Sequence, residues 1–221
     1  MYLRTTVLVL TFLLVGCAPV YIPNVVNTPL LSNKGEIQAA INTGSSGFDP
    51  QIAFAITDNI GVMVNGSFRN STSDTSNNYH KHNFGEIGLG YYKKINLNSR
   101  FGIYSGLGYG EVNVVDESAI FASYSNIYSY RFFIQPEYGT SGKIVDFGIA
   151  SRFVFLNIHQ ASISYTKYYV EPAITARFGL EHFKFSMQFG YSIPLNNNYT
   201  VDYNPFMFSF GLHANINRIF Q

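Results

Sequence analysis

The sequence predicts an all-β protein, a closed antiparallel barrel of ten membrane-spanning strands, with eight or twelve strands as alternatives. Charged residues make up only 12% of the 221 residues, about half their share in a typical soluble domain. Aromatic residues reach 17%, nearly all of them Tyr and Phe. After residue 16, no stretch approaches the roughly 18 apolar residues that a membrane helix needs. A chain this apolar without such helices can cross a membrane only as a closed barrel.

Residues 1–16 have the features of an export signal, with Arg4 followed by a short apolar core from Val7 to Val15. The junction Leu14-Val15-Gly16-Cys17 resembles the bacterial lipobox, in which a cysteine becomes the lipidated first residue. We therefore expect a lipoprotein signal peptide over 1–16 and a diacylglycerol plus a fatty acyl chain such as palmitate on Cys17. The alternative is an ordinary signal peptide that contains a cysteine. Because Cys17 is the only cysteine, no internal disulfide can form.

Residues 17–33 form the next unit, which we expect to be a lipidated tether. From residue 18 onward it contains three prolines and no hydrophobic period. This composition predicts an extended segment, either a tether or a plug.

Residues 34–221 form the predicted barrel, because apolar and polar residues alternate there again and again. In the ninth segment, Phe183, Phe185 and Phe189 share one face, while Lys184 and Gln188 share the other. Each segment is close to the roughly 9–11 residues of a tilted membrane strand. The ten predicted strands are 35–43, 49–57, 59–69, 84–95, 100–113, 127–139, 143–155, 167–179, 182–193 and 204–217.

The polar face carries many glycines, and this decides which face points inward. A soluble exterior would carry more Lys and Glu, whereas small residues and a few charges suit the crowded lumen of a narrow barrel. We therefore expect the bulky aromatic face to meet lipid. The glycines of the polar face are Gly61, Gly88, Gly90, Gly102, Gly106, Gly108, Gly110, Gly148, Gly190 and Gly211.

Connections between the predicted strands alternate in length. Those near 58, 96–99, 140–142 and 180–182 are short, and those at 70–83, 114–126, 156–166 and 194–203 are longer and polar. Only the connection at 44–48 is short on the long-loop side. The alternation is typical of periplasmic turns and extracellular loops. Ten strands place both ends of the barrel in the periplasm, where an anchor in the inner leaflet of the membrane is within reach.

Two prolines interrupt predicted strands. Pro136 and Pro172 each remove one backbone donor from a sheet that has no free edge. We expect bulges at these residues, or errors in the sixth and eighth strands.

The last predicted strand carries a run from Ser209 to Ile216 that resembles the β-signal of outer-membrane barrels, with Gly211, Ala214 and Ile216 in its glycine and apolar positions. The resemblance implies recognition by the barrel-insertion machinery. From residue 34 onward the chain resembles small outer-membrane barrels of the OmpA/OmpX type in the broad sense. Together with the lipobox and the proline-rich tether, it resembles uncharacterised barrel lipoproteins of Bacteroidota.

Charges on the predicted lumen face nearly balance, which argues against strong ion selectivity. Two pairs fall on adjacent strands at similar height, Arg69 with Glu86 and Arg152 with Glu171. We expect a salt-bridged, closed lumen, with a narrow channel or a small-ligand site as the alternative. The predicted lumen charges are Arg69, Lys94, Arg131, Arg152, Arg177, Lys184, Glu36, Glu86, Glu137, Asp146 and Glu171.

Loop residues offer few signs of chemistry. His80 and His82 have metal-ligand spacing, but no third ligand is nearby in the sequence and Lys81 repels a cation, so we expect a solvated loop tip and no metal. Ten strands is also the count of the omptin proteases, but the rim residues match no motif. His159 with Ser162 or Ser164 offers a base and a nucleophile for a lipid-modifying hydrolase. The rim candidates for a protease are Asp74, Asp116, Glu117, His159 and Asp202.

The function expected from these features is non-enzymatic. We expect a structural or interaction component in the bacterial outer membrane, in contact with its lipid and acting as an accessory subunit of a larger assembly. The alternatives are a narrow channel or a surface hydrolase. No feature indicates a cofactor, and a net charge of +1 gives no electrostatic case for nucleic acid.

Overall fold

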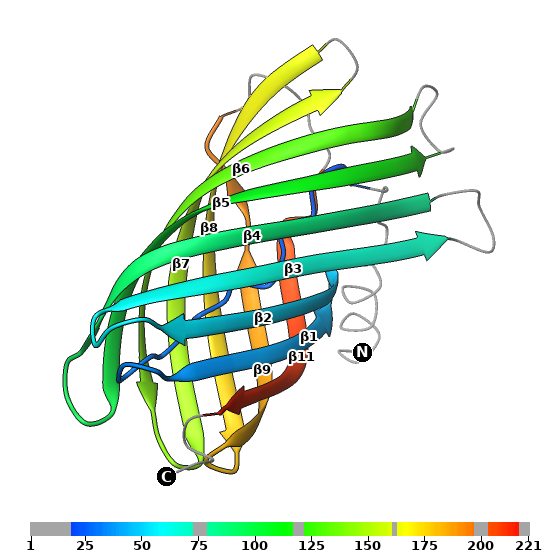
Figure 1. Ribbon diagram of the computed structural model, residues 1–221. Coiled ribbons are helices and arrows are strands. Elements are labelled where there is room, and N and C mark those ends of the chain that lie inside the picture. Colours follow the sequence, from blue (N-terminus) through cyan, green and yellow to red (C-terminus); the bar gives the residue numbers. More distant parts are fainter. Residues whose placement is uncertain (1–18, 73–78, 117–121, 161–162, 197–202, 217–221) are drawn as a thin grey trace, which may run out of the picture.

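The computed structural model describes residues 19–72, 79–116, 122–160, 163–196 and 203–216 as one antiparallel sheet that closes into a barrel (Figure 1). In this part of the chain no helix is long and apolar enough to cross a membrane. The strands are β1 (Ile37–Gly44), β2 (Gly47–Ala55), β3 (Ile60–Thr72), β4 (Tyr79–Lys94), β5 (Ser99–Asp116), β6 (Ala122–Ser141), β7 (Val145–Gln160), β8 (Ile163–Gly179), β9 (Phe183–Tyr191), β10 (Ile193–Pro194) and β11 (Phe206–Asn215).

Ten of these strands form the wall, which confirms the predicted barrel. Neighbours in sequence pair from β1 to β9, β9 pairs with β11, and β11 closes the ring on β1. The closing ladder runs from Gln38 opposite Asn215 to Gly44 opposite Ser209. The two-residue β10 lies against β8 in the register of β9, because Ile193 opposite Val170 continues the ladder of Gly190 opposite Ala173.

We call the two ends of the barrel the turn end and the loop end. The turn end carries the connections 56–59, 95–98, 142–144 and 180–182, close to the predicted short turns. Residues 33–36 and the end of β11 also lie there, as the strand parity predicts. The loop end carries the five other connections.

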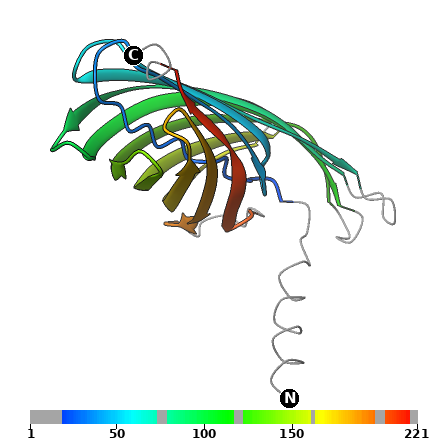
Figure 2. The same ribbon diagram turned by 90° about the horizontal axis from the view of Figure 1, so that it is seen from below.

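The wall is uneven in height. Strands β4 to β8 have 16 to 20 residues, whereas β1, β2, β9 and β11 have 8 to 10. The long strands extend beyond the short ones at the loop end, which gives the barrel a tall side and a low side (Figures 1 and 2).

The predicted loops 70–83, 114–126 and 156–166 are therefore largely wrong, because most of their described residues continue strands β3 to β8. Alternation of hydrophobicity predicts the ends of these strands where the outward-facing apolar residues stop. Outward residues beyond that level, such as Lys81 and Asn83, are polar and exposed, so alternation of hydrophobicity no longer marks the strand.

Side chains alternate between a polar, buried interior and an apolar, exposed exterior. On β9, Lys184, Ser186 and Gln188 are buried, while Phe183 and Phe189 are 58% and 54% exposed. The same pattern holds on the other strands, where the exposed large residues are mainly Ile, Leu, Phe and Tyr. An exterior of this kind fits a membrane surface, and the interior is polar as expected.

Gly106 shows why small residues occur on the inner face. A Cβ atom on Gly106 would lie 2.3 Å from the Ile87 carbonyl oxygen and 2.6 Å from the Phe133 ring. Phe133 is fully buried in the lumen and fills the space that a larger residue would need. Glycine therefore allows close packing inside a narrow barrel.

The expected bulges at the two prolines are not found, and the alternative, errors in the sixth and eighth strands, holds only for their bounds, because β6 and β8 run through both prolines and begin earlier than predicted. Pro136 pairs with Ile103 of β5, but the β6–β7 ladder omits it and resumes in the same register. Pro172 pairs with Ser151 of β7, and the ladder on its β9 side is interrupted and resumes at β10 without a shift. Each proline thus interrupts the pairing with only one neighbouring strand, because the ladder with the other neighbour continues through it. A register shift occurs instead in the β5–β6 ladder, between Val112 and Val114.

Candidate functional site

The lumen is occupied by the chain that precedes β1. We call residues 19–33 the plug segment. Every residue from Val20 to Leu31 is buried, and the segment passes through the interior of the barrel (Figure 2). The segment expected to be a tether or a plug thus lies inside the wall.

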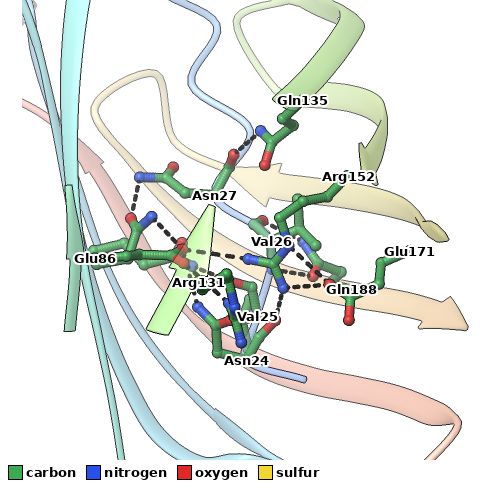
Figure 3. A network of polar contacts seen from close by, with 12 residues as sticks. Asn24, Val25, Val26, Asn27, Glu86, Arg131, Gln135, Arg152, Glu171 and Gln188 are labelled. Atoms are coloured by element: carbon green, nitrogen blue, oxygen red, sulfur yellow. Dashed lines mark hydrogen bonds and ion pairs between the residues drawn. The ribbon is translucent and has the colours of Figure 1, made fainter. Parts of the chain in front are cut away.

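A four-charge cluster lies at the centre of the lumen. Arg131 Nη1 is 3.0 Å from Glu86 Oε2, Arg152 Nη1 is 3.2 Å from Glu86 Oε1, and Arg152 Nη2 is 2.7 Å from Glu171 Oε2. The side chains come from β4, β6, β7 and β8 and are almost completely buried. Figure 3 shows them converging from the surrounding strands. Two cations and two carboxylates give the cluster no net charge.

The plug segment completes this cluster with neutral polar groups. Asn24 donates to Glu86 (3.2 Å), accepts a hydrogen bond from Arg131, and accepts another from Arg152 at its backbone oxygen (3.1 Å). Tyr21 donates to Glu171 (2.7 Å) and accepts from Arg131 (3.2 Å). The plug segment is therefore bound through the same groups that neutralise one another.

Amide side chains hold the next part of the plug segment. The backbone of Val26 makes two hydrogen bonds with Gln188, its N–H donating at 2.8 Å and its carbonyl accepting at 2.7 Å. Gln51 donates to the Val25 carbonyl at 2.7 Å, and Gln135 donates to the Asn27 carbonyl at 2.7 Å (Figure 3). Glutamine can both donate and accept, so it satisfies an extended backbone that has no sheet partner.

A second set of charges lies near the turn end. Lys184 Nζ is 2.6 Å from Asp146 Oδ1, and Arg177 donates to the Thr28 carbonyl at 2.8 Å. Glu36 accepts from the Ser32 N–H at 2.7 Å, and the Arg100 Nε donates to the Ser32 hydroxyl at 2.7 Å. The plug segment is thus bound by polar groups along its whole length.

The buried charges of the described wall balance. Six acidic and six basic side chains are buried, so their formal charges sum to zero, and a balanced lining argues against strong ion selectivity. Two lumen cavities hold only about 30 and 10 Å³, the first large enough for about one water molecule. The buried charged residues are Glu36, Asp49, Glu86, Glu137, Asp146, Glu171, Arg100, Arg131, Arg152, Lys167, Arg177 and Lys184.

Of the two predicted cross-strand pairs, the structure brings Arg152 and Glu171 together as partners on adjacent strands. Arg69 does not meet Glu86, because it lies opposite His82 in the β3–β4 ladder and donates to the Ser45 carbonyl. Glu86 reaches across the lumen instead.

Of the other predicted lumen charges, Lys94 is exposed at the end of β4, whereas Glu137 is buried and accepts from Gln135 at 2.9 Å. Sequence reasoning missed the buried Asp49, Arg100 and Lys167, although all three have the parity of the inner face of their strands.

His80 and His82 do not lie at a solvated loop tip, so that expectation is wrong. They lie on β4, are 4% and 5% exposed, and hydrogen-bond to each other at 2.9 Å. His82 also bonds the Ser67 hydroxyl at 3.0 Å. The alternation of β4 turns both rings inward. Among the described residues, no group of three His, Cys, Asp or Glu is arranged to hold a metal.

The hydrolase candidates are only partly described. His159 is exposed on β7 and its ring packs edge-on against Tyr130. Ser164 lies opposite His159 on β8, and its hydroxyl donates to Asn157 at 3.5 Å. Asp74, Glu117, Ser162 and Asp202 lie outside the described residues, as does the side chain of Asp116.

The predicted insertion signal lies at the closing strand. Ser209, Gly211 and Ala214 are on β11, which pairs with β1, and Ile216 follows its end. Its recognition by insertion machinery stays a prediction. Cys17 lies outside the described residues.

Comparison with known proteins adds no family. No family model matches the chain, and no curated protein matches it. The functional proposal therefore rests on the fold and on the plugged lumen.

Proposed function

We propose that the protein is a non-enzymatic outer-membrane β-barrel lipoprotein that is closed by its own N-terminal segment and has a structural or interaction role. Three features support a location in the outer membrane: the apolar exterior, the short turns at one end, and the long strands that project at the other end. In this orientation the loop end faces the outside of the cell. The lipobox-like junction at Cys17 supports a lipid anchor. In this proposal the barrel resembles the small OmpA/OmpX-type proteins and the barrel lipoproteins of Bacteroidota, and serves as an accessory subunit of a larger assembly.

The observation that carries the proposal is the buried plug segment. A channel needs a continuous water-filled path, whereas residues 20–31 occupy the lumen with hydrogen bonds to the wall throughout. Releasing the segment would leave the buried cluster without its Asn24 and Tyr21 partners. Water entering the emptied lumen would have to replace these hydrogen bonds, so the plug segment is what keeps the cluster both paired and dry.

Conductance in planar bilayers tests the closed lumen. We expect the full chain to be silent and a variant lacking residues 20–31 to give discrete current steps. Heat-dependent gel mobility and circular dichroism establish whether the shortened chain still forms a barrel. Steady conductance steps from the full chain would support the channel alternative instead.

Fatty-acid labelling in growing cells tests the anchor. The full chain should incorporate the label and the Cys17→Ala variant should not. Equal labelling of both chains would contradict lipidation at Cys17.

The interaction role is tested by purification from native membranes in mild detergent. We expect the barrel to migrate as a complex larger than its own mass, with one partner in fixed ratio across preparations. Migration as a single barrel in native membranes would remove the accessory-subunit role.

A further inference from the structure

The direction of the plug segment through the lumen can be read from its contacts with β6. Asn24 contacts Arg131, Asn27 contacts Gln135, and the Leu30 side chain lies beside Gly139. Strand β6 runs from the loop end at residue 122 to the turn end at residue 141. The residue numbers of the plug segment rise together with those of β6, so the segment runs from the loop end to the turn end.

Contacts with β8 give the same direction. Tyr21 bonds Glu171, and Thr28 bonds Arg177, which is two residues from the end of the strand at the turn. At the turn end, Ser32 meets Arg100, the second residue of β5. The chain then enters β1, which begins at that end.

The opposite end of the plug segment lies at the loop end of the lumen. Tyr21 pairs with Tyr203, and its carbonyl accepts from the Asn204 N–H at 2.9 Å, just before β11 begins. The rim there is apolar on its outer face, since Phe206 and Phe48 are 42% and 47% exposed at the loop ends of β11 and β2. Beyond Tyr21, Val20 lies inside the wall with His82 and Ile127, and the Pro19 backbone faces His80 near the loop end of β4.

This direction is opposite to the expectation from the sequence, which placed the anchor in the inner leaflet at the turn end. Strand parity places the start of β1 at the turn end, but it does not fix the path of the chain before β1. Cys17 precedes Pro19 by two residues, which span at most about 7 Å when fully extended. A group attached to Cys17 cannot reach the turn end through a lumen that the plug segment already fills.

We propose that the lipid on Cys17 inserts into the outer leaflet, at the cell surface, with the plug segment threaded through the barrel. The inference rests on the proposed lipid anchor and on the loop end facing outward. In this arrangement, the segment that connects the lipid anchor to β1 passes through the lumen of the barrel.

Thiol labelling on intact cells tests the leaflet, with a polyethylene-glycol maleimide too large to pass through porins. Pro19→Cys places a thiol where the plug segment leaves the loop end, and Leu97→Cys places one in the β4–β5 turn, where Leu97 is 83% exposed. We expect Pro19→Cys to react on intact cells and Leu97→Cys to react only after the outer membrane is permeabilised. The unsubstituted chain should not react, because the Cys17 sulfur carries the diacylglyceryl group in a thioether bond.

Reaction of Pro19→Cys only after permeabilisation would overturn the outer-leaflet placement while leaving the lipid anchor intact. Reaction of the unsubstituted chain would show a free Cys17 and would contradict the anchor itself. If the thiol at position 19 does not react in either state, an epitope inserted between Ala18 and Pro19 replaces it. Antibody binding to that epitope on intact cells supports the threading, and binding only after permeabilisation overturns it.

Discussion

Glu86 joins the two arginines of the central cluster, and replacing it tests the network quantitatively. Its carboxylate is paired with Arg131 and Arg152 and accepts amide hydrogen bonds from Asn24 and Asn65 at 3.2 and 3.0 Å. Glu86→Gln keeps the size of the side chain but leaves the buried cluster with one net positive charge. Loss of one partner from a buried ion pair typically costs about 3–5 kcal/mol.

This cost corresponds to a shift of roughly a hundred- to several-thousand-fold in the unfolding equilibrium. Urea unfolding in lipid vesicles, followed by far-ultraviolet circular dichroism, measures it. Glu181→Gln is the matched control, because Glu181 is exposed in the β8–β9 turn and should change stability by less than about 0.5 kcal/mol.

A double variant separates charge from packing. Glu86→Gln combined with Arg131→Gln restores neutrality and should recover part of the loss. A Glu86→Gln effect no larger than that of Glu181→Gln would refute the view that the cluster is a desolvated, mutually neutralising network.

Three further substitutions test the packing and the plug contacts, all by the same unfolding measurement. Gly106→Ala forces a Cβ against backbone and should cost about 1–3 kcal/mol, whereas Gly85→Ala, with no atom within 4 Å of the new Cβ, should be neutral; equal effects would contradict the close packing of the lumen. Tyr21→Phe removes the donor to Glu171 and should cost about 1–3 kcal/mol; an unchanged midpoint would place the ring outside the lumen. Asp146→Asn should destabilise the barrel, because it leaves the buried ammonium of its lysine partner without a counter-charge; a neutral result would mean that this site is hydrated.

Alternation made the wall predictable. Phe183 and Phe189 face out and Lys184 and Gln188 face in, as their parity predicts, because a strand has a side-chain period of two. Parity also placed Arg131 inside the barrel. The height of the wall was not predictable in this way, since alternation of hydrophobicity ends where the strands leave the apolar belt.

At the centre of the site, side chains contact one another across the lumen, from strands that are not paired in the sheet. Glu86 on β4 pairs with Arg131 on β6 and Arg152 on β7, and neither of these strands neighbours β4. Cross-strand register therefore favoured Arg69 as the partner of Glu86. Asn24 lies in a segment without any period, and its part in the site follows only from the path of that segment through the lumen.

The most direct test of the membrane barrel uses tryptophan fluorescence, because the chain contains no tryptophan. Single variants place the probe either outside, by Phe153→Trp or Phe189→Trp, or inside, by Phe84→Trp or Tyr169→Trp. In vesicles of brominated lipid, we expect strong quenching at the two exposed positions and little at the two buried ones. Quenching of the Phe84→Trp and Tyr169→Trp probes, with the other two protected from lipid, would contradict the account.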